Sequence, residues 1–321
     1  MDSKSKQGFP RNVEVLGWFG RDLKGSYCDR PEQVAQYLNL PLNIDKLKWD
    51  LNVRHPDDEK RWDGTTYEHV FEWIMRNSKT LNGKPYILIQ GVIHFMVFWD
   101  DAKEYREKQE KGSNLVPDNE RFGTKFEHYL QADKPYGAPD PKRPIRRYDD
   151  MALVYSANIG CHRVLYAGEI DGLPNDVQLN NLNAASLVEL KTVKYLNDRN
   201  YPDWWIQSSL SKCDRILLGM RDNAGYVERL QWLSLDELVQ KGRATRKWSP
   251  ERLINAARYA LDVMSSEMKY AGEGEVRMFQ NSFRGLRVSK EKPPQYALDE
   301  LMPASYERWA TSTIRTRQFR K

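Results

Sequence analysis

The chain has few cysteines and no long hydrophobic run, and each shortage excludes a class of protein. Its 321 residues include only three cysteines, Cys28, Cys161 and Cys213, which are widely spaced and form no CxxC pair. This scattered, odd-numbered set predicts reduced thiols and neither a disulfide framework nor a zinc site. The longest uncharged apolar run, residues 86–99, is fourteen residues long, short of the roughly 20 that span a bilayer, so it predicts a buried strand.

The chain also has little net charge and no visible targeting segment. Fifty Lys and Arg oppose 45 Asp and Glu, which leaves a net charge of +5 that permits an anionic partner without requiring one. The first fifteen residues contain no apolar segment of the kind found in secretory signals. Together with the reduced thiols, this predicts an intracellular protein with no membrane partner. Hydrophobic residues make up 40% of the chain and aromatic residues 12%, which predicts a sizeable buried core.

Hydrophobic periodicity predicts a mixed α/β (α+β) fold with central mixed β-sheets and flanking helices. We expect strands at about 13–19, 86–99, 164–172 and 185–193, and a hairpin of 215–220 with 226–233. We expect helices at about 31–40, 65–77 and 101–120, one that bears Trp204, Trp205 and Gln207, and one at about 250–268. The last of these has the clearest start, because Ser249 can act as N-cap, Pro250 as the first helical residue, and Trp248 can pack on Leu253.

Residues 131–150, with four prolines and one glycine, have the composition of a linker. The candidate acidic residues described below fall on both sides of this segment, at 127 and at 169–189. A shared site requires both sides to pack together, so we do not divide the chain there. We predict one catalytic domain over residues 1–321, with flexible ends at about 1–10 and 290–321.

Two short acidic motifs are the most informative residues of the chain. Glu169 and Asp171 are two apart in one apolar segment, and Glu189 and Lys191 are two apart in the next. Residues two apart in a strand share a face, so pairing of these strands would bring three carboxylates and one ammonium together. Clustered buried carboxylates repel one another unless a cation neutralises them. Oxygen ligands suit Mg²⁺ or Mn²⁺, which bind phosphates and activate water.

Each motif alone is weak evidence for a site. Acidic residues are 45 of 321, so pairs such as Glu-x-Asp and Glu-x-Lys occur by chance, most often on a solvated strand face. The occurrence of both motifs in neighbouring apolar segments favours a buried site. An acidic residue, a gap and then Glu-x-Lys is the pattern of metal-dependent nucleases of the PD-(D/E)XK type.

Further motifs extend this pattern to most of the chain. A GxxxE motif ends at Glu127, WWxQS occupies residues 204–208, and a hydrophobic-Gly-x-Arg-Asp motif ends at Asp222. In this order, over roughly residues 10–285, the chain resembles the decapping exoribonuclease family called DXO. That family includes the fungal activating partner of the nuclear 5′→3′ exoribonuclease. The resemblance implies a hydrolase with a PD-(D/E)XK-like metal site that acts on RNA 5′ ends.

The resemblance also implies a role for each matching residue. Glu127, Asp171 and Glu189 would be direct ligands of two divalent cations, Mg²⁺ or Mn²⁺, assisted by the backbone carbonyl of Leu190. Glu169 would act through a metal-bound water. Lys191 and Gln207 would contact the scissile phosphate or the attacking water. The implied catalytic residues are therefore Asp171, Glu189, Lys191 and Gln207.

The implied reactions are removal of pyrophosphate from 5′-triphosphate RNA, removal of incomplete or NAD-type caps, and 5′→3′ exonuclease digestion in some members. The resemblance favours a nuclear protein, with the cytoplasm as the alternative. Two other interpretations stay open. The chain could be a weakly active or inactive relative that stabilises a larger 5′→3′ exoribonuclease, or a DNA nuclease with the same metal chemistry.

One residue departs from the family pattern. Members carry Arg-Gly on a strand upstream of GxxxE, and this chain has Gln90 before Gly91. We assign Gln90 to substrate binding together with Lys191 and Gln207. A glutamine still donates a hydrogen bond but carries no charge, so its phosphate contact is weaker than that of arginine.

Several other conspicuous residues have simpler interpretations. His128 is interpreted as structural or solvated, Cys161 and His162 as core or edge residues, and Trp204 and Trp205 as core rather than as base-stacking residues. Four cations lie within residues 142–147. They fit an RNA-backbone rim, a nuclear-import signal or an ordinary solvated loop equally well.

Overall fold

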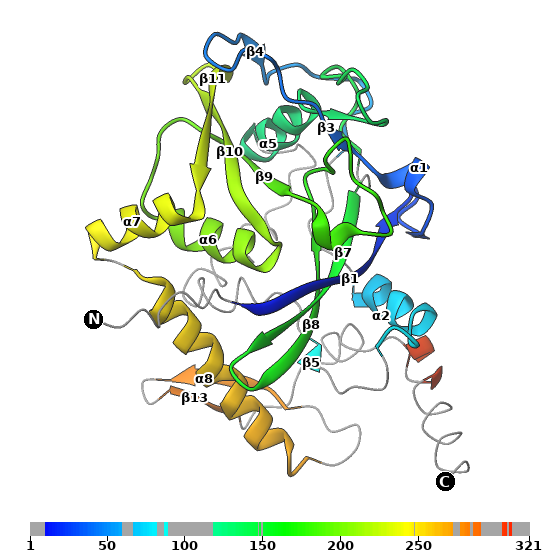
Figure 1. The fold of residues 1–321 in the computed structure, drawn as a ribbon, viewed down its shortest axis with the longest axis vertical. Coiled ribbons are helices and arrows are strands. Elements are labelled where there is room, and N and C mark those ends of the chain that lie inside the picture. Colours follow the sequence, from blue (N-terminus) through cyan, green and yellow to red (C-terminus); the bar gives the residue numbers. More distant parts are fainter. Residues whose placement is uncertain are drawn as a thin grey trace.

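The fold contains two larger β-sheets, and the chain passes from the first sheet to the second within residues 150–193 (Figure 1). The computed structural model of the chain describes residues 10–59, 67–81, 87–88, 118–146, 148, 150–246, 248–271, 277–282, 285–289, 304–306 and 308–309. Within this part of the chain, no helix is both long enough and apolar enough to cross a membrane.

The first sheet has the strand order β2-β1-β7-β8-β5. Its long strands are β1 (Arg11–Arg21), β7 (Asp150–Ile159) and β8 (His162–Glu169), and neighbouring members of this trio run antiparallel. The short strands β2 (Tyr27–Cys28) and β5 (Ile87–Leu88) flank them, β5 running parallel to β8. The long-range pairing of β1 with β7 fixes the N-terminal segment against the middle of the chain.

The second sheet has the order β4-β11-β10-β9. Strands β10 (Cys213–Arg221) and β11 (Tyr226–Ser234) form the expected hairpin, and β4 (Trp49–Asp50) pairs with β11. Strand β9 (Leu187–Val193) runs parallel to β10, and the helix α6 (Tyr201–Leu210) makes the crossover between them. A parallel pair requires such a crossover, and here the helix carries the WWxQS segment.

Helices cover both faces of the second sheet. Ile216 and Leu218 of β10 pack in the same apolar cluster as α6, whereas Leu217 packs with α5 (Asp118–His128) on the other face. This alternation follows from the two-residue period of a strand. α7 (Leu235–Thr245) begins at a Ser234–Glu237 capping box, and α8 (Pro250–Met268) begins at Ser249, whose side chain accepts a hydrogen bond from the backbone of Arg252.

The remaining elements are short or peripheral. They are α1 (Pro31–Val34), β3 (Tyr37–Leu38), α2 (Tyr67–Arg76), β6 (Gln131–Ala132), the 3₁₀ helix η2 (Leu182–Ala184), β12 (Phe279–Ser282) and β13 (Gly285–Val288). β3 pairs with β6, and β12 with β13. The helix α2 packs on β1 through an apolar cluster that contains Val70, Phe71, Trp73 and Phe19.

The mixed α/β fold predicted from periodicity is confirmed, with differences in detail. The helix expected over 31–40 is a single turn, and the chain then extends into β3. Only residues 87–88 of the strand expected at 86–99 lie within the described chain, and residues 101–117 of the expected helix lie outside it. All three cysteines are free thiols, as expected.

Candidate active site

Strand β9 supplies the centre of the candidate site. Glu189 and Lys191 share one face of the strand, and the Lys191 Nζ donates to the Glu189 Oε1 at 2.5 Å. Glu189 is 3% exposed, whereas the Lys191 side chain is 25% exposed and so reaches the surface of the site. Two residues of one strand therefore place a buried carboxylate beside a partly exposed ammonium.

The helix α6 adds Gln207 to the same carboxylate. Pro202 lies in the first turn of this helix, and Trp204, Trp205, Ile206 and Leu210 are buried, so the helix is held firmly against the sheet. The Gln207 Nε2 donates to the Glu189 Oε1 at 2.7 Å. The core role predicted for the two tryptophans is confirmed, and they leave Gln207 pointing at β9.

Asp171 joins the site from the first sheet. It follows the end of β8, and its Oδ2 accepts a hydrogen bond from the Leu190 backbone N–H at 2.5 Å. The strand pairing suggested by the two acidic motifs is not present, because β8 pairs with β7 and β5 while β9 pairs with β10. The carboxylates converge because the two sheets meet here, not because the strands share a ladder.

Glu127 comes from α5, which packs on the face of the second sheet opposite to α6. The preceding residue, Phe126, packs so closely over Gly219 of β10 that a Cβ added at Gly219 would lie 2.5 Å from the Phe126 ring. The glycine of the hydrophobic-Gly-x-Arg-Asp motif therefore lets α5 dock. From this position the negative charge of Glu127 raises the pKa of both Asp171 and Lys191.

Glu169 takes a different position from the other predicted ligands. Its Oε1 accepts a hydrogen bond from Arg21 at 3.0 Å, and the Arg21 Nε also donates to Asp150 at 2.9 Å. Arg21 and Asp150 are buried, whereas the Glu169 side chain is about one-third exposed. The Arg21 guanidinium thus neutralises and orients Glu169 at the edge of the cluster, which fits the indirect role that the family resemblance implies.

The charges at the centre perturb one another. Burial raises the pKa of Asp171 well above its usual value, and the negative charges of Glu189 and Glu127 raise it further, against the opposing effects of Lys191 and the Leu190 N–H. Burial alone lowers the pKa of Lys191, but the charges of Glu189, Asp171 and Glu127 outweigh it and raise the pKa above its usual value. Lys191 is therefore a permanent cation at neutral pH.

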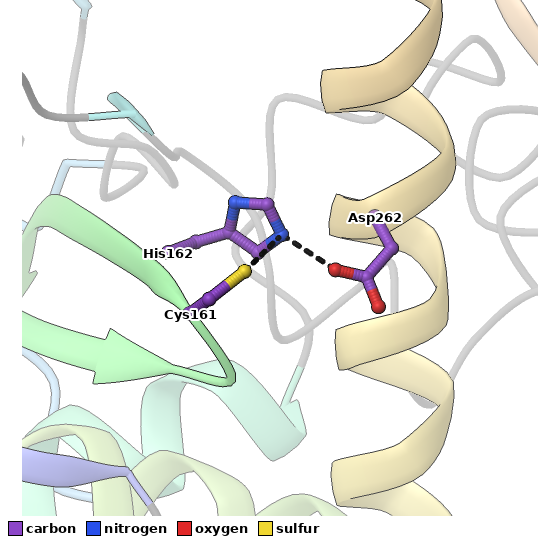
Figure 2. A group of neighbouring side chains, drawn as sticks. All are labelled: Cys161, His162 and Asp262. Carbon is purple, nitrogen blue, oxygen red and sulfur yellow. Dashed lines mark hydrogen bonds and ion pairs between the residues drawn. The ribbon is translucent and has the colours of Figure 1, made fainter.

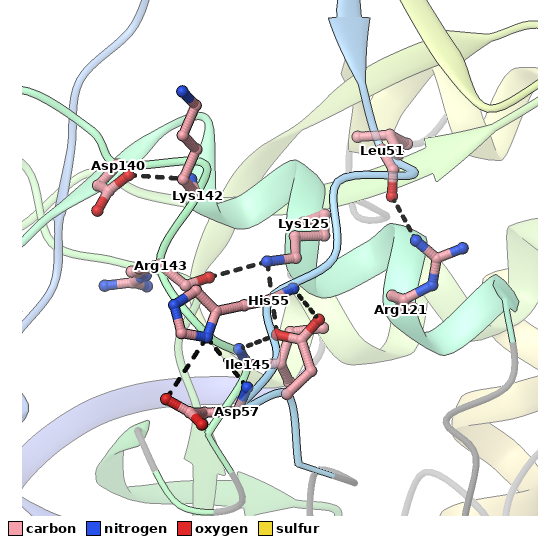
Figure 3. A network of polar contacts seen from close by, with 10 residues as sticks. Leu51, His55, Asp57, Arg121, Lys125, Asp140, Lys142, Arg143 and Ile145 are labelled. Atoms are coloured by element: carbon pink, nitrogen blue, oxygen red, sulfur yellow. Dashed lines mark hydrogen bonds and ion pairs between the residues drawn. The ribbon is translucent and has the colours of Figure 1, made fainter.

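Polar contacts hold the backbone at Asp171 in place, and they continue into a network around Arg143 and Lys125 (Figure 3). The Gln131 Nε2 donates to the Asp171 carbonyl oxygen at 2.6 Å, and Arg143 donates to the Gln131 Oε1 at 2.6 Å. The fully buried Lys125 donates to the Arg143 carbonyl at 2.8 Å and lies 3.7 Å from Asp58. Arg143, assigned from sequence only to a basic loop, is therefore part of the framework of the site.

The donor set fits divalent cations of the hard type. Glu127, Asp171 and Glu189 offer carboxylate oxygens, the Leu190 carbonyl belongs to the same strand, and these residues include no sulfur or imidazole ligand. Burial, and then the negative charges of Glu189 and Glu127, raise the pKa of Asp171, and a bound cation would offset the repulsion between these carboxylates. Mg²⁺ or Mn²⁺ meets that requirement.

Other predicted residues fall outside this arrangement or outside the described chain. His128 is buried, consistent with its structural interpretation. Gln90 lies outside the described residues, so its substrate-binding role stays a prediction. The sequence does not single out the supporting residues Arg21, Gln131 and Lys125, because each contacts a residue 18 or more positions away and no local period marks such a contact.

Comparison with known proteins agrees with this chemistry. The family model described as RAI1 like PD-(D/E)XK nuclease matches residues 85–307. The mouse decapping and exoribonuclease protein is 24% identical over 289 residues, covering 77% of this chain and 72% of its own length. The Aspergillus fumigatus decapping nuclease RAI1 is 30% identical over 183 residues, covering 50% of this chain and 49% of its own.

Solved structures share the fold. Scheffersomyces stipitis Rai1 superposes with a TM-score of 0.75 at 15% identity, covering 97% of this chain and all of its own. Candida albicans Rai1, solved in complex with pU5 and Mn²⁺, gives a TM-score of 0.72 at 19% identity, covering 96% of this chain and 97% of its own.

Proposed function

The chain belongs to the family of RAI1-like PD-(D/E)XK nucleases, and from this premise we propose that it is a metal-dependent hydrolase of RNA 5′ ends. The proposed reactions are removal of pyrophosphate from 5′-triphosphate RNA and removal of incomplete or NAD-type caps, with 5′→3′ exonuclease digestion as a further activity. The names of the relatives, decapping nuclease and decapping exoribonuclease, support this choice of substrate.

The observation that carries the proposal is the shared carboxylate of Glu189. Its Oε1 accepts hydrogen bonds from both Lys191 and Gln207, at 2.5 and 2.7 Å, while Asp171 and Glu127 place two more negative charges beside it. Acidic ligands with an adjacent cation and an amide donor are the parts that a phosphoryl-transfer site requires.

Each residue then has a role that follows from its position. Glu127, Asp171, Glu189 and the Leu190 carbonyl would hold two cations, which when bound supply Lewis acidity and lower the pKa of a coordinated water. Lys191 is a permanent, partly exposed cation, and it stabilises negative charge that develops on the phosphate oxygens. Gln207 orients the attacking water or the phosphate through its amide group. Arg21 holds Glu169 at the edge of the site.

The test uses RNA that carries a 5′-triphosphate or an NAD cap, incubated with Mn²⁺ or with EDTA. We expect metal-dependent release of pyrophosphate or of the intact cap. Glu189→Gln keeps the size of the side chain but removes a ligand charge, so we expect a loss of at least about 100-fold in kcat/KM. Glu228→Gln is the matched control, because this exposed carboxylate lies in the same sheet away from the cluster. Full turnover by folded Glu189→Gln contradicts the proposal.

The alternative is a weakly active relative that stabilises a larger 5′→3′ exoribonuclease in the nucleus. Gln90, in place of the family arginine, favours this alternative, whereas the complete acidic cluster favours catalysis. The same incubation separates them, because a protein that binds Mn²⁺ but releases no product from any RNA end fits the alternative. A parallel incubation with 5′-phosphorylated DNA tests the third possibility, a DNA nuclease.

A further inference from the structure

A second group of metal-ligand side chains lies at the end of β8 opposite to Glu169 (Figure 2). Cys161 is in the turn between β7 and β8, His162 is the first residue of β8, and Asp262 faces them from α8. His162 and Glu169 are the first and last residues of the extended strand β8, seven positions apart, a span of about 23 Å. The group is therefore separate from the acidic cluster.

The three side chains are carried by elements that are fixed relative to one another. Ile159 pairs with His162, which leaves a tight turn of only Gly160 and Cys161, and Gly160 has a φ of +64°. A Cβ at Gly160 would lie 3.2 Å from the Arg258 Nε, so the glycine allows the turn to approach α8 closely. Buried Ala257 and Leu261 of α8 lie in the same apolar cluster as Ile159.

The Cys161 sulfur and an Asp262 carboxylate oxygen both lie close to the His162 Nε2. The His162 Nε2 is 2.7 Å from the Asp262 Oδ1 and 3.7 Å from the Cys161 Sγ, and the three ligand atoms all lie within 4.8 Å of one another. Tetrahedral zinc with bonds of about 2.0 Å to nitrogen and oxygen and 2.3 Å to sulfur separates N from S by about 3.5 Å and N from O by about 3.3 Å. The observed distance from the His162 Nε2 to the Cys161 Sγ already fits zinc. A small rotation of the exposed Asp262 side chain would lengthen the distance from Nε2 to the Asp262 Oδ1 to the required value.

The three side chains do not form a complete hydrogen-bonded set among themselves. One imidazole nitrogen cannot donate a proton to the Asp262 carboxylate and at the same time accept one from the Cys161 thiol. A central cation accepts a lone pair from each of the three atoms. A thiolate, an imidazole and a carboxylate together favour zinc over the Mg²⁺ or Mn²⁺ that suits the all-oxygen cluster.

We propose that Cys161, His162 and Asp262 bind one Zn²⁺ ion, with water in the fourth position, and that the ion ties the β7–β8 turn to α8. The cysteine spacings alone excluded a zinc site, and this proposal revises that prediction. The third ligand comes from a helix 100 residues away, so no local spacing announces it. Cys161 and Asp262 are exposed, which gives the ion an open path to the site.

The test is titration of the metal-free full-length chain with Co²⁺, followed by absorption spectroscopy. Cobalt bound through a thiolate gives a sulfur-to-metal charge-transfer band that an all-oxygen site cannot give. We expect this band to saturate at one equivalent and to disappear when Zn²⁺ is added. We also expect Zn²⁺ to slow the reaction of Cys161 with a thiol reagent by at least about tenfold, because the metal holds the thiolate.

Three variants give the proposal its controls. Cys161→Ser, at an exposed turn position, should abolish the band, and Asp262→Asn should weaken Co²⁺ binding by at least about tenfold. Glu251→Gln is the matched control. It removes an exposed ion pair between Glu251 of α8 and Arg243, and it should change neither the band nor Co²⁺ binding. A wild-type protein without the band, a band that persists in Cys161→Ser, or thiol reactivity that ignores Zn²⁺ overturns the site. None of these readouts depends on hydrolytic activity, so they are independent of the proposed function.

Discussion

Among single residues, Asp171 is the one on which the needs of binding and of stability conflict most. It must lie beside Glu189 and Glu127 to serve as a metal ligand, yet burial and those two charges raise its pKa well above the usual 3.8. A group whose folded pKa is raised contributes stability that is complete below the unfolded pKa and is lost as the pH rises through the folded pKa. In the metal-free protein, ionised Asp171 therefore lowers the free energy of unfolding.

We expect Asp171→Asn to raise the melting temperature of the metal-free protein by a few degrees at neutral pH, because it removes this charge. The gain should grow as the pH rises above 3.8, because Asp171 of the unfolded wild type ionises there while the folded protein still resists ionisation. The same variant should lose the rise in melting temperature that Mn²⁺ gives the wild type. Thermal unfolding at several pH values, with and without Mn²⁺, measures both. Asp176→Asn, at an exposed neighbouring position, should match wild type.

The uncharged Gln90 leads to a second expectation at the residue scale. If the missing positive charge limits recognition of the 5′ phosphate, Gln90→Arg should raise kcat/KM on 5′-phosphorylated ends by about tenfold, the value of one charge-assisted hydrogen bond. Its effect on an unphosphorylated 5′ end should be small. Equal rates for variant and wild type on both substrates would show that the charge at this position is not limiting.

The residues that we propose for catalysis are easier to predict than those that support them. Lys191, Glu189 and Gln207 stand in motifs whose spacing reflects a strand face or a helix turn, so the sequence carries their geometry. Gln131 and Arg21 act through long-range hydrogen bonds, to residues 40 and 148 positions away, and no local period encodes these.

At the scale of elements, the docking of α5 on β10 sets the position of Glu127. The close contact between Phe126 and Gly219 fixes this helix against the sheet. Apolar patterns predict the strands β1, β8 and β9 and the β10–β11 hairpin, but they cannot tell which sheet each strand joins. For that reason the idea of pairing the Glu169 and Glu189 strands was wrong, while the convergence of Asp171 and Glu189 was right.

We expect Gly219→Ala to lower the free energy of unfolding by about 1–3 kcal/mol, since the added methyl overlaps the Phe126 ring. It should also weaken Mn²⁺ binding, because α5 carries Glu127. Gly123→Ala is the control on the same helix. An added Cβ there meets nothing within 4 Å, so it should stabilise the protein by about 0.5–1 kcal/mol. Urea unfolding and Mn²⁺ titration report the two effects, and Phe126→Leu in the Gly219→Ala background should restore part of both.

At the scale of the whole molecule, the net charge of +5 is modest, so the attraction of an RNA depends on where the basic residues lie. Arg143 is engaged in the framework around Asp171, so the cations of the 142–147 segment do not all face solvent. Lys142 is exposed and Arg146 is half-buried, and both are available to an RNA backbone near the site.

We expect the double variant Lys142→Gln, Arg146→Gln to reduce the salt dependence of RNA binding. For single strands the slope of log K against log salt falls by about 0.7 per phosphate contact, so two contacts change it by about 1.4. Binding of a 5′-phosphorylated oligonucleotide is measured over a salt series, in the Glu189→Gln background to prevent turnover. Lys241→Gln with Arg243→Gln on α7 removes the same charge and should leave the slope unchanged. An unchanged slope in the first pair favours a nuclear-import signal or a solvated loop.

The strand pairing also has a consequence for how the chain reaches this fold. β1 pairs with β7 more than 120 residues later, and β4 pairs with β11 a further 70 residues on, so the N-terminal segment supplies a strand to each sheet. During synthesis this segment must wait until residue 234 has left the ribosome before both of its partners exist. Contacts so distant in sequence slow folding, because loops must close before the contacts form. We therefore expect the two halves of the active site to assemble late, in one cooperative step, after the β10–β11 hairpin has formed.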